Sequence, residues 1–138
     1  MFRKDFLEKQ LEELGLVIAK LIGDFLDVKQ EISFSRGTEK VNEALQTEFN
    51  ISLEEIQAID KDKLIEHLTQ TKQLKTGTLN LLADLLFATA TFIENSENPG
   101  PAKDLFSKTL LLYDHVNKEQ KTFSEARQQK INTLKSKI

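Results

Sequence analysis

Residues 79–93, with the sequence LNLLADLLFATATFI, decide the fold more directly than any other stretch of the chain. Asp84 is the only charged residue among them, and apolar side chains surround the whole circumference of the helix that they predict. A helix that is apolar on every side is buried on most sides. We therefore expect this segment, capped by Thr78, to be the central helix of an all-α domain.

The N-terminal segment carries a second helical pattern, which predicts a helix from about residue 3 to residue 31. Apolar residues at alternating intervals of four and three keep one seam of a helix facing a partner helix. The seam consists of Leu7, Leu11, Leu14, Ile18, Leu21, Phe25 and Val28. Gly15, Ala19 and Gly23 repeat every four residues on one face. Because glycine inside a helix costs about 1 kcal/mol relative to alanine, we expect another helix backbone to approach closely there.

This first helix also supplies the candidate interaction surface. Its seam and flanking apolar row are wider than one short neighbour need cover, and contiguous exposed apolar surface marks an interface. We therefore favour a homodimer slightly over a monomer. The candidate helix-packing or interaction residues are Leu7, Leu11, Leu14, Gly15, Ile18, Ala19, Leu21, Gly23 and Phe25.

Local signals predict a short helix after the first one. Residues 33–37 contain Gly37 between polar residues and indicate a break. Thr38 then suits the N-cap of a helix over residues 38–49, and Asn50 suits its end.

Two further short helices follow from capping signals. Ser52 and Glu55 have the spacing of a capping box, which predicts a helix over residues 52–59. Asp60 suits the N-cap of a further helix over residues 61–74.

The C-terminal part begins with the clearest loop of the chain, residues 98–101, where Pro101 suits the first turn of a helix. That helix is predicted to end near Lys118, with one broad face made of Ala102, Leu105, Phe106, Thr109, Tyr113 and Val116. Thr122 and Glu125 form another capping box for a last surface helix. Its thin stripe consists of Phe123, Ile131, Leu134 and Ile138.

Composition excludes several kinds of site. The chain has 138 residues, which fits one domain over residues 1–138, and it has no cysteine. Disulfides, thiolate metal sites and cysteine nucleophiles are therefore excluded. Neither of the two histidines, His67 and His115, has a glutamate three residues before it, as di-iron bundle sites require. With no phosphate-binding or nucleophile motif in the sequence, we predict no catalytic residue, cofactor or metal, and no enzyme.

Charge is distributed unevenly along the chain. The net charge is −3, but residues 1–69 are acidic and residues 70–138 are basic. We interpret the basic C-terminal helix as a solvated face that is attracted to the acidic half of the same or another chain. Nucleic-acid binding is disfavoured because the basic residues are dilute and only Phe123 could stack on a base.

No feature of the sequence indicates export or membrane insertion. Charged residues interrupt the apolar residues at the N-terminus, so there is no signal-peptide core. The longest uncharged stretch, residues 85–93, is far shorter than the roughly 20 residues that a membrane span needs. We expect a soluble cytoplasmic protein with no membrane partner.

Two stretches resemble known families. Residues 83–116 resemble a tetratricopeptide repeat (TPR), a helix-turn-helix unit of about 34 residues, in Leu86, Ala90, Ile93, Ala102 and Phe106. They depart from that pattern at Thr89, Asp114 and Gly100-Pro101, and no second copy follows or precedes them. Residues 2–23, reading F-x-x-x-F-L-x-x-Q-L-E-x-L-G-x-x-I-A-K-L-I-G, resemble the opening of a family of uncharacterised bacterial all-helical proteins. The first resemblance implies antiparallel helix stacking, with a peptide groove only by analogy; the second implies no activity.

We therefore predict an all-α domain of about six to seven antiparallel helices, stacked as a TPR-like α-α superhelix or as an irregular bundle. The predicted function is a non-catalytic protein-protein interaction or scaffold module, with a protein partner or a second copy of the chain. One alternative is a small-molecule binding module with a cleft near the Gly15/Gly23 groove. The other is an enzyme of unrecognised type. A ligand site requires an apolar pocket with a few convergent polar groups, whereas an interaction module exposes an apolar groove or patch.

Overall fold

The structure, a computed structural model, describes residues 15–16, 19–20, 34–96, 98–121 and 123–138. These residues form helices and no strand, which confirms the predicted all-α class. The elements in chain order are α2 (Phe34–Ala44), η1 (Leu45–Phe49), α3 (Leu53–Ala58), α4 (Lys61–Glu66), η2 (His67–Thr71), α5 (Thr76–Glu94), α6 (Ala102–Gln120) and α7 (Glu125–Lys137). The two η elements are single π-helical turns that extend α2 and α4.

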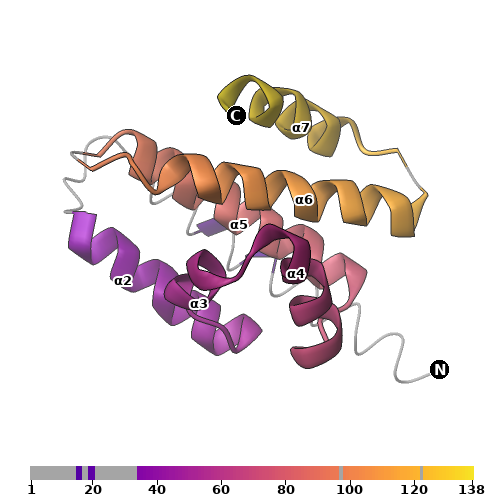
Figure 1. Cartoon of the computed structure of the whole chain (residues 1–138), viewed down its shortest axis with the longest axis horizontal. Helices are drawn as coiled ribbons and strands as arrows, with labels where there is room; N and C mark the ends of the chain where they lie inside the picture. Colours follow the sequence, from indigo (N-terminus) through magenta and orange to yellow (C-terminus); the bar gives the residue numbers. More distant parts are fainter. Residues whose placement is uncertain (1–14, 17–18, 21–33, 97, 122) are drawn as a thin grey trace.

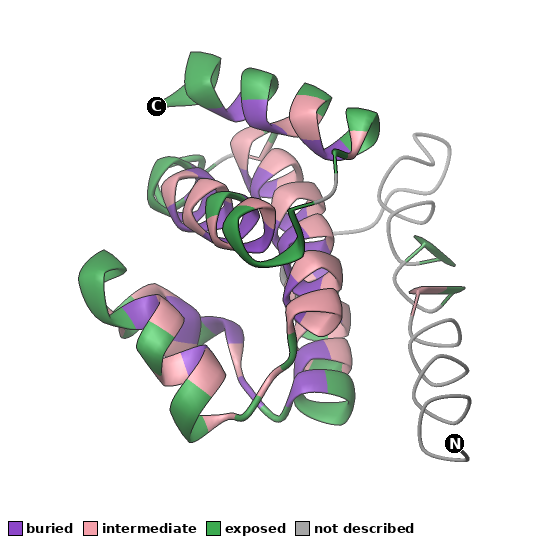
Figure 2. Ribbon diagram, turned by 90° about the vertical axis from the view of Figure 1, so that its right-hand side faces the viewer, coloured by how far each residue is buried: buried purple, intermediate pink, exposed green. Residues whose placement is uncertain are grey.

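Helices α5 and α6 form an antiparallel hairpin at the centre of the described part of the chain (Figure 1). No residue of α5 is exposed over its 19 residues, as the all-round apolar sequence predicts. Its buried residues lie where it faces its neighbours (Figure 2). The predicted cap at Thr78 is wrong, because α5 begins at Thr76 and Lys75 occupies the N-cap without a side-chain hydrogen bond. Helix α5 therefore begins without a side-chain cap, and its first buried residue is Leu79.

Helix α6 buries the face that its sequence predicts. Every residue of that face is buried: Ala102, Leu105, Phe106, Thr109, Tyr113 and Val116. The ring of Phe106 packs edge-on against the ring of Phe87 from α5, with 6.2 Å between the ring centroids. Such aromatic pairs favour edge-to-face geometry. Apolar side chains thus hold the two long helices together.

Helix α7 lies over the α5–α6 hairpin (Figure 1). Ile131 and Leu134 are buried as predicted, whereas Phe123 and Ile138 are exposed. The predicted cap at Thr122, which lies outside the described residues, is replaced by Ser124, whose Oγ accepts a hydrogen bond from the backbone N–H of Arg127 at 3.2 Å. The apolar stripe of α7 is therefore only two residues long.

The break predicted at residues 33–37 is wrong, because α2 begins at Phe34 and runs through Gly37. Gly37 faces the ring of Phe92 in α5, and a Cβ atom at this position would lie 2.5 Å from its Cζ. This glycine permits close packing of two helices and does not end one. Thr38 accordingly lies inside α2, not at its N-cap. Beyond it, α2 and η1 bury Val41, Leu45 and Phe49.

The remaining short helices follow their local signals closely. Helix α3 begins after Ser52, whose Oγ accepts a hydrogen bond from the N–H of Glu55 at 3.0 Å. Asp60 occupies the N-cap of α4 as predicted, although its side chain makes no capping bond. The second of these helices ends at Thr71, three residues earlier than predicted. Asn50 and Gln73, with φ angles of 55° and 57°, turn the chain after the two π-helical segments.

Candidate functional site

Only two of the nine predicted interaction residues, Gly15 and Ala19, are described. A Cβ atom at Gly15 would lie 3.9 Å from Cδ2 of Leu81 in α5, which is an ordinary van der Waals distance. Among the described residues, the nearest group to Gly15 is therefore a side chain that leaves room for alanine, and the close backbone approach expected along Gly15, Ala19 and Gly23 stays a prediction. The other seven residues lie outside the described part of the chain: Leu7, Leu11, Leu14, Ile18, Leu21, Gly23 and Phe25.

The described residues of the N-terminal segment have one side that faces solvent. Leu16 is 68% exposed, and Ala19 and Lys20 are exposed as well. Residues three and four positions apart are neighbours on a helix surface, so these three residues share one face. Gly15, beside Leu81, marks the side that faces α5.

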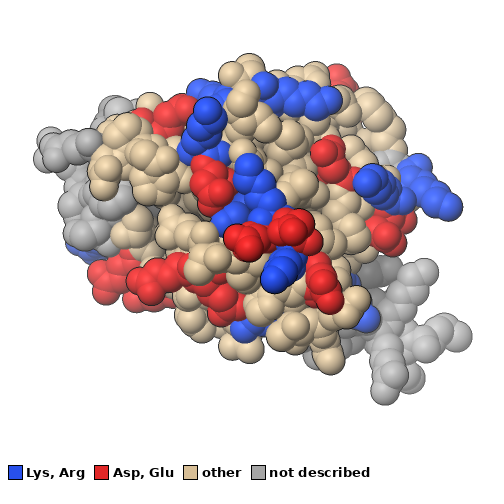
Figure 3. Space-filling view, viewed as in Figure 1, with Lys and Arg blue, Asp and Glu red and all other residues tan. Residues whose placement is uncertain are grey.

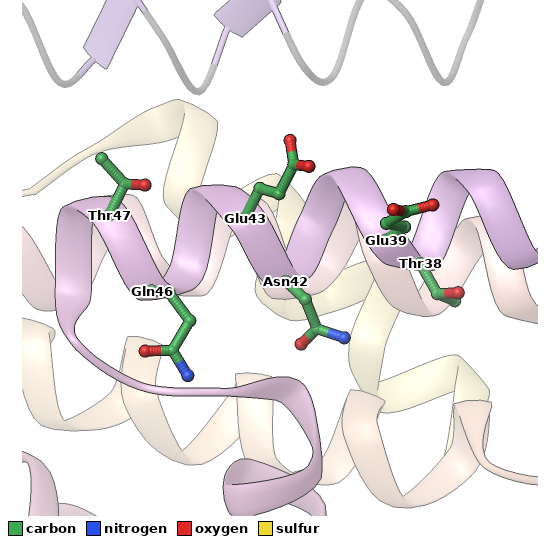
Figure 4. Close-up of a pocket in the computed structure, with 6 residues that line it drawn as sticks. All are labelled: Thr38, Glu39, Asn42, Glu43, Gln46 and Thr47. Atoms are coloured by element: carbon green, nitrogen blue, oxygen red, sulfur yellow. The ribbon is translucent and has the colours of Figure 1, made fainter.

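A hollow of about 580 Å³ lies along α2 and η1, lined by Thr38, Glu39, Asn42, Glu43, Gln46 and Thr47. All six residues come from one helical stretch, and Figure 4 shows their side chains pointing to different sides of it. The Oδ1 atom of Asn42 already accepts a hydrogen bond from the N–H of Leu53 at 2.8 Å. This open polar surface lacks the apolar walls and convergent groups of a small-molecule site.

A polar junction lies where α5, α6 and α7 meet. The Tyr113 hydroxyl of α6 donates a hydrogen bond to Oδ1 of Asp84 in α5 at 2.5 Å, and Nζ of Lys130 in α7 lies 2.9 Å from the same oxygen. Burial, together with the neighbouring Asp84 carboxylate, raises the pKa of the Tyr113 hydroxyl far above its usual range. Tyr113 therefore stays protonated and acts as a fixed donor, not as an acid or base.

Arg127 extends this junction along α7. Its side chain is buried, and its Nε donates to Oδ1 of Asn117 in α6 at 2.6 Å. Its Nη1 lies 3.4 Å from Oδ1 of Asn80 in α5 and 3.3 Å from Oε1 of Gln120 in α6. The sequence analysis did not predict that Arg127 joins α7 to the hairpin, because an arginine in a polar helix is expected to face solvent.

Further along α7, Lys137 pairs with Glu94 of α5 at 2.8 Å, and its Nζ lies 5.8 Å from the ring centroid of Phe106. The two described ion pairs of α7 thus join it to Asp84 and Glu94, in the same half of the chain. These two ion pairs do not involve the acidic N-terminal half of the chain. The predicted attraction between that half and the basic C-terminal helix therefore stays a prediction. Figure 3 shows Lys and Arg side chains along α7 and acidic side chains over α2.

A buried lysine joins the short helices to the hairpin. Lys108 of α6 is 2% exposed, and its Nζ donates to the carbonyl oxygens of Ile56 at 2.9 Å and Gln57 at 2.8 Å. A carboxylate oxygen of Asp104 lies 2.8 Å from the same Nζ. These acceptors match the three donors of a lysine ammonium, so Lys108 is fully satisfied and structural.

The histidine with the most developed surroundings is His67. Its Nε2 lies 2.7 Å from Oε2 of Glu55, and Nζ of Lys72 lies 3.3 Å from the same oxygen and donates to the carbonyl of Asn50 at 2.8 Å. The hydrogen bond with His67 and the nearby Lys72 lower the pKa of Glu55 below its ordinary value of 4.5. Glu55 lies in the first turn of α3, His67 lies where α4 passes into η2, and Asn50 and Lys72 follow η1 and η2, so this cluster ties the short helices together.

The polar clusters share one property, which is that their members bond to one another. In the described part of the chain, every buried side-chain nitrogen and oxygen has a hydrogen-bond partner. Over the same residues, no group of three or more histidine, aspartate or glutamate side chains is placed to hold a metal ion. These clusters fix the described helices relative to one another.

Helix α5 also meets the length and composition of a membrane-spanning helix, and it is the one such helix among the described residues. Half of its apolar window is buried inside the fold. Central helices of soluble domains have the same composition, so this property of α5 is weak evidence for insertion.

Comparisons with protein-family models, with curated proteins and with solved structures find no match to this chain.

Proposed function

We propose that the chain is a non-catalytic helical interaction module, and that the solvent-facing side of its predicted N-terminal helix, at Leu16 and Ala19, binds a second copy of the chain. The observation that carries this proposal is the exposure of Leu16, 68% of whose surface is open to solvent beside exposed Ala19. The small side chain of Ala19 leaves room for a partner helix to approach closely, and the partner then covers Leu16 on the same face. Two-fold pairing, in which the same patch is used on both chains, is the commonest way to cover such a face.

The polar groups of the described residues support a binding role more than a catalytic one. A general base needs an orienting neighbour and a reacting group within reach. His67 has the neighbour Glu55, but the pair is shared with Lys72 and ties helix ends. Asp84 is likewise occupied by Tyr113 and Lys130. The proposal assigns these groups to rigidity and leaves recognition to the exposed face that carries Leu16 and Ala19.

The resemblance of residues 83–116 to a TPR adds a second element to the proposal. The α5–α6 hairpin has the antiparallel stacking that the resemblance implies, and a scaffold role follows from it by analogy only. With no cysteine in the chain, a reducing cytoplasm is the proposed setting.

Single-cysteine crosslinking tests the proposed interface cleanly, because the natural chain has no cysteine. Under oxidation, we expect Leu16→Cys to give a covalent dimer and the matched variant Gln129→Cys, on the exposed side of α7, to remain a monomer. Light scattering across a dilution series should show a dimer for the wild type and a monomer for Leu16→Asp. A wild-type monomer at the highest soluble concentration would overturn the proposal.

A further inference from the structure

We infer that α7 is an exchangeable helix, and that the face of the α5–α6 hairpin that α7 covers can accept the α7 of a second copy of this chain. This face, called the groove below, is defined by Asn80, Asp84, Glu94, Asn117 and Gln120. The inference concerns a different surface from the N-terminal face proposed above and does not depend on it. Three observations carry it: how little of α7 is apolar and buried, where its contacts run, and how the chain enters it.

The contact of α7 with the rest of the molecule is thin. Of its 13 residues, three are buried, namely Arg127, Ile131 and Leu134. Only two of these are apolar, whereas seven apolar residues of α5 are buried. Helices in proteins are stabilised mainly by packing of an apolar face, so α7 is the long helix with the weakest hold on the fold.

The contacts of α7 converge on the hairpin. Arg127 bonds to α5 and α6, Lys130 to Asp84, and Lys137 to Glu94. The partners in α5, Asn80, Asp84 and Glu94, follow one another in the same order as Arg127, Lys130 and Lys137 in α7. The hairpin therefore contacts α7 at several points along its length. Because both sides of this pattern belong to every copy of the chain, an α7 from a second copy makes the same bonds.

The entry to α7 is strained. Lys121, the residue that ends α6, has a φ angle of 56°, in the left-handed region that side chains other than glycine rarely adopt. Opening the connection releases this strain, while the closed and exchanged forms share the remaining contacts. Short strained connections favour exchange of terminal elements between copies.

Complementary charge inversion tests exchange in the full chain. One variant carries Asp84→Lys and Glu94→Lys, and the other carries Lys130→Glu and Lys137→Glu. Each variant alone sets like charges against each other in the groove, whereas an exchanged heterodimer pairs opposite charges in both of its grooves. On mixing, we expect a heterodimer enriched about tenfold over either homodimer, as a modest electrostatic preference summed over several pairs gives.

The matched control is a single chain that carries all four inversions, in which the charges pair within one molecule. If this control folds as a monomer and the mixed variants still form no heterodimer, exchange is overturned. Adding Leu16→Asp to both variants should leave the heterodimer intact, which separates this result from the N-terminal interface.

A second measurement uses the Leu16→Asp chain, in which the N-terminal face cannot contribute a dimer, and keeps the inference testable should the inverted control fail to fold. After refolding of this chain at high protein concentration, we expect the added Lys121→Gly to lower the dimer fraction several-fold, because glycine removes the strain of the closed form. The matched variant Lys118→Gly, one turn earlier on the exposed side of α6, should not favour the closed form. A dimer fraction that is absent after refolding of Leu16→Asp, or equal with and without Lys121→Gly, contradicts the inference.

Discussion

The α5–α6 hairpin and the short helices between Phe34 and Thr71 fold by different means. Helices α5 and α6 have 19 residues each and lack a side-chain hydrogen bond at their N-caps. The helices before them have 5 to 11 residues, and α3 begins at a capping serine. A short helix is marginal alone because its first turn is costly to form. The two long helices are thus fixed by burial, whereas α3 also has a side-chain hydrogen bond at its first turn.

Two side chains show how the regions meet. Gly37 of α2 lies against Phe92 of α5, and Lys108 of α6 reaches the last carbonyl groups of α3. The first contact is apolar and needs the absence of a side chain. The second is polar and places a positive charge at the C-terminal end of a helix, where it is favourable.

The largest expected effect lies in the hairpin. Leu86 of α5 is fully buried, so Leu86→Ala should lower the free energy of unfolding by roughly 2–5 kcal/mol, through lost burial and the cavity left behind. Urea denaturation monitored by circular dichroism measures this. Leu111→Ala, at a partly exposed position of α6, should cost clearly less. Equal losses for the two variants would mean that burial in the hairpin does not set its stability.

The junction between the two regions comes next. Lys108→Met keeps the length of the side chain but removes the donors to Ile56 and Gln57, and should cost about 1.5–3 kcal/mol, as for hydrogen bonds to charged groups. Lys103→Met, at an exposed position five residues earlier in α6, should change stability by no more than about 0.5 kcal/mol. If both variants are equally stable, the two regions are joined without Lys108.

Helix ends provide a smaller and more direct test. Ser52→Ala removes the acceptor for the N–H of Glu55 and should cost about 1 kcal/mol. Lys75→Ala, at the N-cap of α5, removes no capping bond and should change stability by no more than about 0.5 kcal/mol. Thermal unfolding of both variants measures the contrast. A larger loss for Lys75→Ala would reverse the distinction between capped and buried helices.

The sequence predicted most of the apolar framework. All-round apolar character placed α5 at the centre, and the spacing along α6 identified its buried face residue by residue. Both signals depend on apolar residues. Burial of an apolar side chain is favourable whichever segment covers it, so the pattern can be interpreted before the neighbour is known. The break expected at Gly37 failed because a glycine within a helix and a glycine that ends a helix look alike until the neighbour, here Phe92, is known.

The polar junctions could not be predicted, because they join residues far apart in the chain. Arg127 bonds to Asn80 across 47 positions, and Lys108 reaches Ile56 across 52. Taken alone, Arg127, Asn80 and Lys108 are of residue types that usually lie on a solvated surface. The nearest available signal was Asp84, a single charge inside an apolar helix, which requires a partner when it is partly buried. The sequence did not identify Tyr113 and Lys130 as those partners.

The smallest expected effect concerns acid and the cluster at the ends of the short helices. The pKa of Glu55 is lowered below 4.5 by its hydrogen bond with His67 and by Lys72, so the ionised form is favoured in the folded state. Its stabilising contribution is therefore present above pH 4.5 and lost as the pH falls through the lowered pKa. Between pH 6 and pH 3, the wild type should lose more stability than Glu55→Gln, with Glu54→Gln, an exposed neighbour, behaving as the wild type. Chemical denaturation at both pH values measures the difference.

Because His67 and Glu55 are each about a third exposed, salt should shrink the difference. A pH dependence identical in the wild type and Glu55→Gln would show that the short helices are held without this pair, and that their ends rely on backbone turns and Ser52 alone.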